Sequence, residues 1–325
     1  MQFKKLETLA VAIAMTTSVP AWAAWPDDKP IEVVVGFAAG GGTDLMARKL
    51  LPHVQKRLGP QVQFVVQNKP GAAGEIATAQ VARAKPDGYT LAIVNVPGFL
   101  FIPMTKKAQY ETSDFQLISR VVDDPTVMVT RSDNKTSTFD GVLATLKKDP
   151  GSLSFGHNGT GTNGELALQL LGGAINSNLT GVVYKGTSAQ KVDVMGGHLG
   201  YGLVSVGEVP ELHGKAAEAA GHLHALVQFG SKRSPAFPQV PTAVEMGIDV
   251  LMSSERGFAA PKGVAADIVR KLDQAIAESL KDPAFIENAS ADAPVLAYLP
   301  GDQWTASLQQ NLKLLEPLAK AAHKR

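Results

Sequence analysis

The 325-residue sequence contains no cysteine. This absence excludes disulfide scaffolds, cysteine nucleophiles, cysteine-ligated zinc and iron–sulfur sites, and lipid attachment through a cysteine. A surplus of one charge sign is also missing, because 31 lysines and arginines stand against 30 aspartates and glutamates, giving a formal net charge of +1. Proteins that bind nucleic acid normally carry a basic surplus gathered on one face, so we expect no nucleic-acid partner.

Aromatic residues and long apolar runs are scarce as well. Only 6% of the residues are aromatic, whereas 31 glycines and 20 prolines indicate many tight turns, which favours an α/β protein over an all-β one. No run approaches the roughly 18 apolar residues of a membrane-spanning helix. The length is about twice that of a typical domain, and an apolar content of 45% is enough for full cores, so we expect two domains.

The N-terminal segment has the layout of a secretory signal peptide. Lys4 and Lys5 precede an apolar stretch from Leu9 to Met15, and Ala21-Trp22-Ala23 places small residues at the two positions that a signal peptidase reads. We therefore expect residues 1–23 to be removed. Because no cysteine follows the cleavage site, we expect a freely diffusing periplasmic protein without a lipid anchor.

The rest of the chain alternates between strand and helix patterns. A β-branched run at Ile31 to Val35 is followed by a segment with apolar residues every four positions, which predicts a helix from Asp44 to Leu58. Strands at 62–66 and 89–94 flank a further helix, and strand–helix alternation predicts a parallel sheet covered by helices. The pattern restarts near Val127, so the sequence predicts two αβ blocks in tandem.

A glycine-rich loop, Phe37-Ala38-Ala39-Gly40-Gly41-Gly42-Thr43-Asp44, joins the first predicted strand to the first helix. Glycines let backbone amides approach a ligand, and the start of a helix presents unpaired N–H groups with a partial positive charge. The loop is therefore a candidate anion site. An equally open interpretation is a simple strand–helix turn in which Thr43 or Asp44 caps the helix.

A second glycine loop, from Phe155 to Gly164, again follows a strand and precedes a helix. Its glycines spell G-x-G-x-x-G, but a dinucleotide site needs an acidic residue about 20 positions further on, where this chain has Tyr184-Lys185-Gly186. We therefore expect no cofactor. Two such loops, one in each domain, predict a cleft in which each domain holds one end of a small anion.

An enzymatic alternative uses the second loop. The sequence has no G-x-S-x-G elbow and no H-E-x-x-H motif. A periplasmic hydrolase of small esters or amides would use His157 with Thr160 or Thr162 as nucleophile, but no pair of groups to activate it is evident. We expect no metal site, because no third kind of ligand accompanies the histidines at His213, His222 and His224.

Several motifs resemble the solute-binding proteins of tripartite tricarboxylate transporters, also called Bug proteins. Trp25-Pro26, Lys29-Pro30-Ile31, the first glycine loop and Ala47-Arg48 are similar to the mature start of that family. Further motifs follow in the family's order over nearly the whole mature chain: Asn68 to Gly74, Pro86 to Leu91, Tyr184 to Gly186, Gly196 to His198, Lys232 to Pro235, Val240 to Thr242 and Ala260 to Gly263.

The resemblance implies a fold and a function. The fold is a two-lobed α/β periplasmic binding protein of type II-like topology, with doubly wound sheets and a ligand cleft between lobe 1 (24–125 plus 262–325) and lobe 2 (126–261). The implied function is capture of a small organic acid and its delivery to the membrane permease subunits of a tripartite transporter. We expect a monomer without enzymatic activity.

The resemblance also implies the ligand contacts. The first loop receives one carboxylate through backbone amides and bridging waters, the second loop receives the other end, and residues after two strands complete the cleft. For Asp44 and Asn163 a role limited to helix capping is equally open. The expected site residues are Phe37, Ala39, Gly40, Gly41, Thr43, Asp44, Asn95, Pro97, Gly159, Thr160, Gly161, Thr162, Asn163 and Ser205.

One departure from the family pattern bears on the ligand. Family members often carry a histidine where this chain has Glu165, and a carboxylate at the mouth of the second loop would repel a second ligand carboxylate. We therefore hypothesise a ligand with one carboxylate and a neutral or cationic far end, although we favour an interpretation in which Glu165 faces solvent. Glu255 and Arg256 either contact the ligand or pair with each other, and we favour the pair.

Overall fold

The computed structural model describes residues 25–212, 223–289 and 293–322. The predicted signal peptide, 1–23, therefore lies outside the described residues, as do His213 and His222. Within the described ranges, no helix is both long enough and apolar enough to cross a membrane.

The chain begins with an αβ block that follows the predicted alternation. Its elements are β1 (Ile31–Val35), α1 (Gly42–Leu58), β2 (Phe64–Asn68), the 3-10 turn η1 (Ala72–Gly74), α2 (Glu75–Ala82), β3 (Thr90–Val96), α3 (Gly98–Thr105) and η2 (Thr112–Asp114). The short apolar helix α3 was not predicted from the sequence.

The second block starts with a long strand and repeats the alternation. Its elements are β4 (Phe115–Arg131), α4 (Phe139–Lys148), β5 (Ser154–His157), α5 (Asn163–Ala174), β6 (Thr180–Val183), α6 (Thr187–Met195), β7 (Tyr201–Ser205), η3 (Val206–Glu208), η4 (Pro210–Leu212) and β8 (Leu223–Gln228). The chain then returns through β9 (Ser253–Pro261), α8 (Ala266–Ser279), α9 (Pro283–Ala289), η5 (Ala293–Val295), β10 (Leu296–Pro300) and α10 (Gly301–Ala322).

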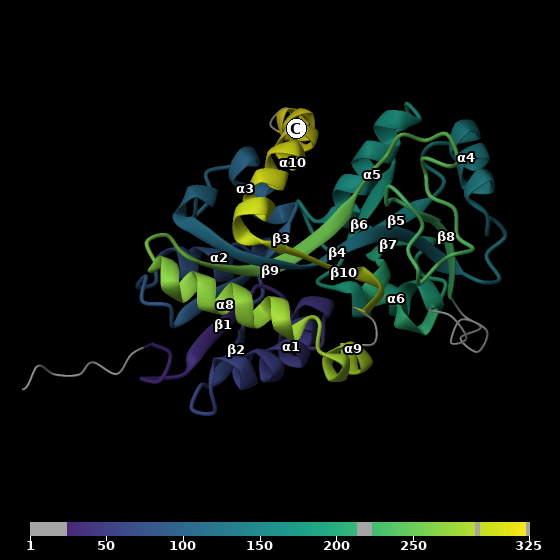
Figure 1. Cartoon of the computed structure of the whole chain (residues 1–325). Coiled ribbons are helices and arrows are strands. Elements are labelled where there is room, and N and C mark those ends of the chain that lie inside the picture. The colour runs from purple at the N-terminus through teal and green to yellow at the C-terminus, as the bar shows by residue number, and fades with distance from the viewer. Residues whose placement is uncertain (1–24, 213–222, 290–292, 323–325) are drawn as a thin grey trace, which may run out of the picture.

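The strands form one mixed sheet that runs through the whole molecule (Figure 1). The order is β2-β1-β3-β9-β4-β7-β5-β6, and both β8 and β10 also pair with β4. Pairing is parallel in β2-β1-β3 and in β6-β5-β7, as expected for αβ blocks, whereas β9 and β4 join these groups in antiparallel fashion.

Strand β4 connects the two lobes. Residues 115–125 of β4 pair with β9 and β10, whereas residues 126–131 pair with β7 and β8. We call the part built on β1, β2, β3, β9 and β10 lobe 1 and the part built on β5 to β8 lobe 2. The predicted lobe boundaries at 126 and 262 stay a prediction, and the pairing of β9 with β3 supports a second crossing near Ser253.

The core lies on both faces of this sheet, which explains why β1 is apolar throughout. Alternate residues of a strand point to opposite faces. Ile31, Val33 and Val35 pack in one cluster with Met46 of α1, whereas Val34 belongs to the cluster on the other face. A strand that is buried on both faces reads as a continuous apolar run.

Candidate functional site

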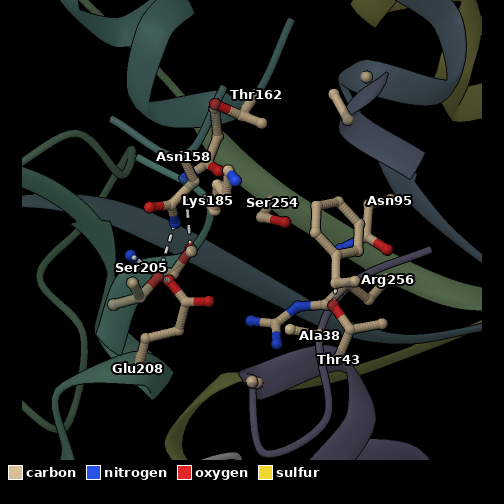
Figure 2. Close-up of a pocket in the computed structure, with 18 of the residues that line it drawn as sticks. Ala38, Thr43, Asn95, Asn158, Thr162, Lys185, Ser205, Glu208, Ser254 and Arg256 are labelled. Atoms are coloured by element: carbon tan, nitrogen blue, oxygen red, sulfur yellow. Dashed lines mark hydrogen bonds between the residues drawn. The ribbon is translucent and has the colours of Figure 1, made fainter. Parts of the chain in front are cut away.

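A cavity of about 290 Å³ lies between the two lobes. Its walls are the ends of β1, β3 and β7 and the starts of α1, α3, α5 and α6, so both lobes contribute (Figure 2). Of the predicted site residues, the cavity is lined by Phe37, Ala39, Gly41, Thr43, Asn95, Pro97, Thr162, Asn163 and Ser205.

Part of the first glycine loop lines this cavity, and Asp44 of α1 holds the loop in place. Gly41 and Thr43 line the cavity. The carboxylate of Asp44, whose side chain is 2% exposed, accepts hydrogen bonds from the Gly40 amide at 2.9 Å and from Arg48 Nε at 2.8 Å. The cavity lining includes neither Gly40 nor Asp44, so this aspartate caps its own loop.

The titration of Asp44 reflects this environment. Burial raises the pKa of the carboxyl, but hydrogen bonds from the Gly40 amide and Asn68, together with Arg48, outweigh burial and leave the pKa below its usual value. Asp44 is therefore ionised at neutral pH and fixes the shape of the loop.

The second glycine loop repeats this arrangement. Glu165 is half-buried and its Oε2 accepts the Gly161 amide at 2.6 Å, so this carboxylate neither lines the cavity nor faces open solvent. The repulsion inferred for Glu165 thus loses its basis. Gly159 and Thr160 line a neighbouring cavity instead, and the Gly161 amide is occupied.

Polar side chains connect the cavity walls behind the ligand space. Asn163 Nδ2 donates to Thr126 Oγ1 at 2.7 Å and to Ser205 Oγ at 3.2 Å. Asn95 Nδ2 donates to Thr43 Oγ1 at 2.9 Å, and its buried Oδ1 has no hydrogen-bond partner within the described part of the chain. Asn95 Oδ1 is therefore an unused hydrogen-bond acceptor at the cavity wall.

A third glycine-containing turn contributes residues that sequence reasoning missed. Lys185, Gly186 and the first turn of α6 (Thr187, Ser188 and Ala189) line the cavity. The strand–glycine–helix pattern was visible in Tyr184-Lys185-Gly186, but a single glycine carried too little signal. Further lining residues outside the prediction are Ala38, Gly42, Ala73, Val96, Gly98, Asn158, Glu208, Ser254 and Arg256.

Four helix starts therefore converge on one cavity. The N-cap residues of α1, α3, α5 and α6 are Gly41, Pro97, Thr162 and Gly186, and none of these four makes a side-chain capping hydrogen bond. First-turn amides have no partner inside a helix, and helix N-termini carry a partial positive charge. The arrangement favours an anion without requiring a dedicated cationic side chain.

Charged side chains are nevertheless present at the floor of the cavity. Arg256 of β9, 2% exposed, forms a buried ion pair with Asp124 of β4, which is fully buried. Asp124 Oδ1 also accepts the Gly207 amide at 2.9 Å, so this carboxylate ties lobe 1 to the start of η3 in lobe 2.

The favoured pairing of Glu255 with Arg256 is wrong. Consecutive residues of a strand point to opposite faces, and each finds its own partner. Glu255 accepts from Arg120 Nη1 at 3.0 Å and from Trp304 Nε1 at 2.7 Å, on the face away from the cavity. Arg256 pairs with Asp124 and lines the cavity.

Glu208 is the carboxylate that lines the cavity. Its Oε2 accepts from Thr187 Oγ1 at 2.8 Å and from the Ser205 amide at 3.2 Å. A Cβ added at Gly42 would lie 2.7 Å from Arg256 Nη1 and 3.2 Å from Glu208 Cγ, so both side chains pack over the start of α1. In Figure 2 the guanidinium and the carboxylate face each other across the cavity floor.

The geometry gives little support to the hydrolase alternative. Thr162 Oγ1 donates to the Gly159 carbonyl at 2.7 Å, and His157 Nδ1 lies 3.3 Å from the same oxygen. The His157 ring packs over Gly181 of β6. Among the described residues, no group of three or more histidines or acidic residues is placed to hold a metal ion.

Comparisons with known proteins agree on one family and one fold. Residues 46–321 match the family described as "Tripartite tricarboxylate transporter family receptor". Protein BugT of Bordetella pertussis is 35% identical over 280 residues, covering 83% of this chain and 82% of that protein. The solved periplasmic binding protein BugD aligns with a TM-score of 0.80 at 30% identity, covering 91% of this chain and 98% of its own.

A more distant structure shares the fold. MatC from Rhodopseudomonas palustris, solved with bound malate, aligns with a TM-score of 0.78 at 24% identity and covers 89% of this chain and 98% of its own. Together with BugD, it confirms the predicted two-lobed α/β fold of a periplasmic binding protein.

Proposed function

Because the chain belongs to the tripartite tricarboxylate transporter receptor family, as its resemblance predicted, we propose that it captures a small organic acid between its lobes in the periplasm and delivers it to a membrane permease. The acid's carboxylate lies at the four helix starts, and the permease recognises the loaded receptor. Capture involves no chemical conversion of the ligand.

The observation that carries this proposal is the convergence of the starts of α1, α3, α5 and α6 on one cavity formed by both lobes. Charge-assisted hydrogen bonds contribute about 1.5–3 kcal/mol each. Four of them give roughly 6–12 kcal/mol, from which association costs of about 4 kcal/mol or more are subtracted. The remaining roughly 2–8 kcal/mol corresponds to affinities from tens of millimolar to about micromolar, without an arginine clamp. The bound malate of MatC, a protein of the same fold, is consistent with such a ligand.

A charge placed at one helix start tests the proposal. Ser188 is the second residue of α6, is exposed and lines the cavity. Ser188→Asp places a carboxylate where helix geometry tolerates it, because acidic residues in a first turn stabilise a helix. We expect this variant to keep its melting temperature without ligand and to lose at least tenfold in carboxylate affinity, measured by calorimetry over a panel of organic acids.

Ser188→Asn is the matched control, since it has a similar size and no charge. It is expected to retain affinity within about threefold of the wild type, while the corresponding neutral amides bind neither protein. If the wild type bound the amides as tightly as the acids, or if the aspartate variant bound acids unchanged, the carboxylate would not lie at these helix starts.

A further inference from the structure

A second cavity, which we call the outer groove, adjoins the ligand cavity. Its volume is about 790 Å³, against about 290 Å³ for the inner cavity. Both lobes form it, through the 70–73 turn and α3 on one side and the second glycine loop and the end of β6 on the other. The two cavities share the lining residues Phe37, Ala38, Ala73, Asn158 and Lys185, so they adjoin each other.

The outer groove is largely apolar. Buried Phe101 and Ile102 of α3 form one side of it, and Val183 and Tyr184 form another. Val183 is 64% exposed, and this large aliphatic side chain lies in a groove that adjoins the ligand cavity. Covering it with an apolar group removes apolar surface from water and is favourable.

Two cations line the outer groove, and one of them lies at its junction with the inner cavity. Among the described residues that line it, the cations are Lys106 and Lys185. Lys106 Nζ lies 2.5 Å from Glu75 Oε2, so its charge already has a partner, while Lys185 lies at the junction shared with the inner cavity. A second carboxylate at the far end of the groove would therefore lack a counter-charge.

The junction itself is built from backbone in an uncommon conformation. Ala72 and Ala73 have φ values of 47° and 55°, in the left-handed region that non-glycine residues rarely occupy. This conformation places Ala73 in the lining of both cavities, and a Cβ added at Gly159 of lobe 2 would lie 4.0 Å from Ala73 Cβ. Small residues from the two lobes therefore face each other at close range where the cavities meet.

We propose that the ligand is a monocarboxylic acid with an extended apolar tail, whose carboxylate occupies the inner cavity and whose tail passes Ala73 into the outer groove. This inference rests on the proposed function and narrows its ligand class. It retains the single carboxylate hypothesised from the sequence, and it assigns a neutral, apolar far end.

Calorimetric titration of the wild-type protein with straight-chain monocarboxylates from butyrate to decanoate tests the proposal, with the dicarboxylates of equal length in parallel. We expect affinity to rise about fourfold per added methylene as the tail fills the groove. Each dicarboxylate is expected to bind at least tenfold more weakly than the monocarboxylate of its length. Affinity that peaks at six carbons or fewer, or dicarboxylates that bind as tightly, would overturn the inference while leaving carboxylate capture intact. Absence of binding by every acid would contradict the proposed function itself.

Two valines of similar exposure provide the matched variants. Val183 lines the groove and Val192 lies on α6 away from both cavities, at 64% and 61% exposure. Val183→Asp is expected to reduce the preference for octanoate over butyrate about tenfold, with butyrate affinity unchanged. Val192→Asp is expected to preserve the preference. Equal behaviour of the two variants would place the tail outside this groove.

Discussion

At the scale of single residues, two carboxylates shape the site without lining it. Asp44 and Glu165 each lie four positions after the glycine whose amide they accept, Gly40 and Gly161. Both acids occupy the first turn of their helix, where negative charge is favourable. Each carboxylate occupies one loop amide and thereby fixes the conformation of its loop.

Replacing Asp44 tests this role. We expect Asp44→Asn to lower the free energy of unfolding by roughly 1–3 kcal/mol, because the amide cannot replace both acceptor oxygens of a buried carboxylate. The pKa of Asp44 is lowered in the folded state, so its stabilisation is fully present above its unfolded pKa of about 3.9 and is lost as pH falls through the lower folded value. Urea unfolding should therefore show a constant difference above about pH 5 that shrinks in acid.

Asp140 supplies the control for this experiment. It also lies in the first turn of a helix, α4, but it is exposed. We expect Asp140→Asn to change stability by less than about 0.5 kcal/mol at any pH. A difference between Asp44→Asn and the wild type that grew in acid would contradict the assigned cap.

At the scale of elements, the sequence patterns predicted the strand–helix order and both glycine loops, but they did not predict every element that lines the cavity. Helix α3 was not predicted because a helix that is buried on every side shows no amphipathic period. Its residues Phe99, Leu100, Phe101 and Ile102 are all buried. The ion pair between Arg256 and Asp124 was not predicted because the two residues are 132 positions apart, a separation that no local pattern encodes. Glu165 was misplaced because spacing alone does not tell which way a first-turn side chain points.

The junction of β4 and β9 gives a prediction at the same scale. Asp124→Ala removes one partner of a buried ion pair and the acceptor for the Gly207 amide, so we expect the free energy of unfolding to fall by about 3–5 kcal/mol. Lys320→Ala disrupts the exposed pair with Glu316 and should cost less than about 1 kcal/mol. Chemical denaturation of both variants measures the two losses in free energy of unfolding. Similar losses would show that the buried pair stabilises the fold no more than the exposed pair does.

At the scale of the whole molecule, the formal net charge of +1 leaves no long-range attraction for an anion. Under the proposed function this attraction is local, because the fold brings helix starts from both lobes to one cavity that β9 also lines. The continuous sheet joins the lobes through its central strands, β4 and β9.

Native mass spectrometry of the protein, purified from the periplasm without denaturation and incubated with a panel of organic acids, addresses carboxylate capture most directly. We predict one acid per chain on the wild type and on Ser188→Asn, and none on Ser188→Asp at the same concentration. A wild-type protein that retained only compounds without a carboxylate, or equal retention by the aspartate variant, would contradict capture at the four helix starts.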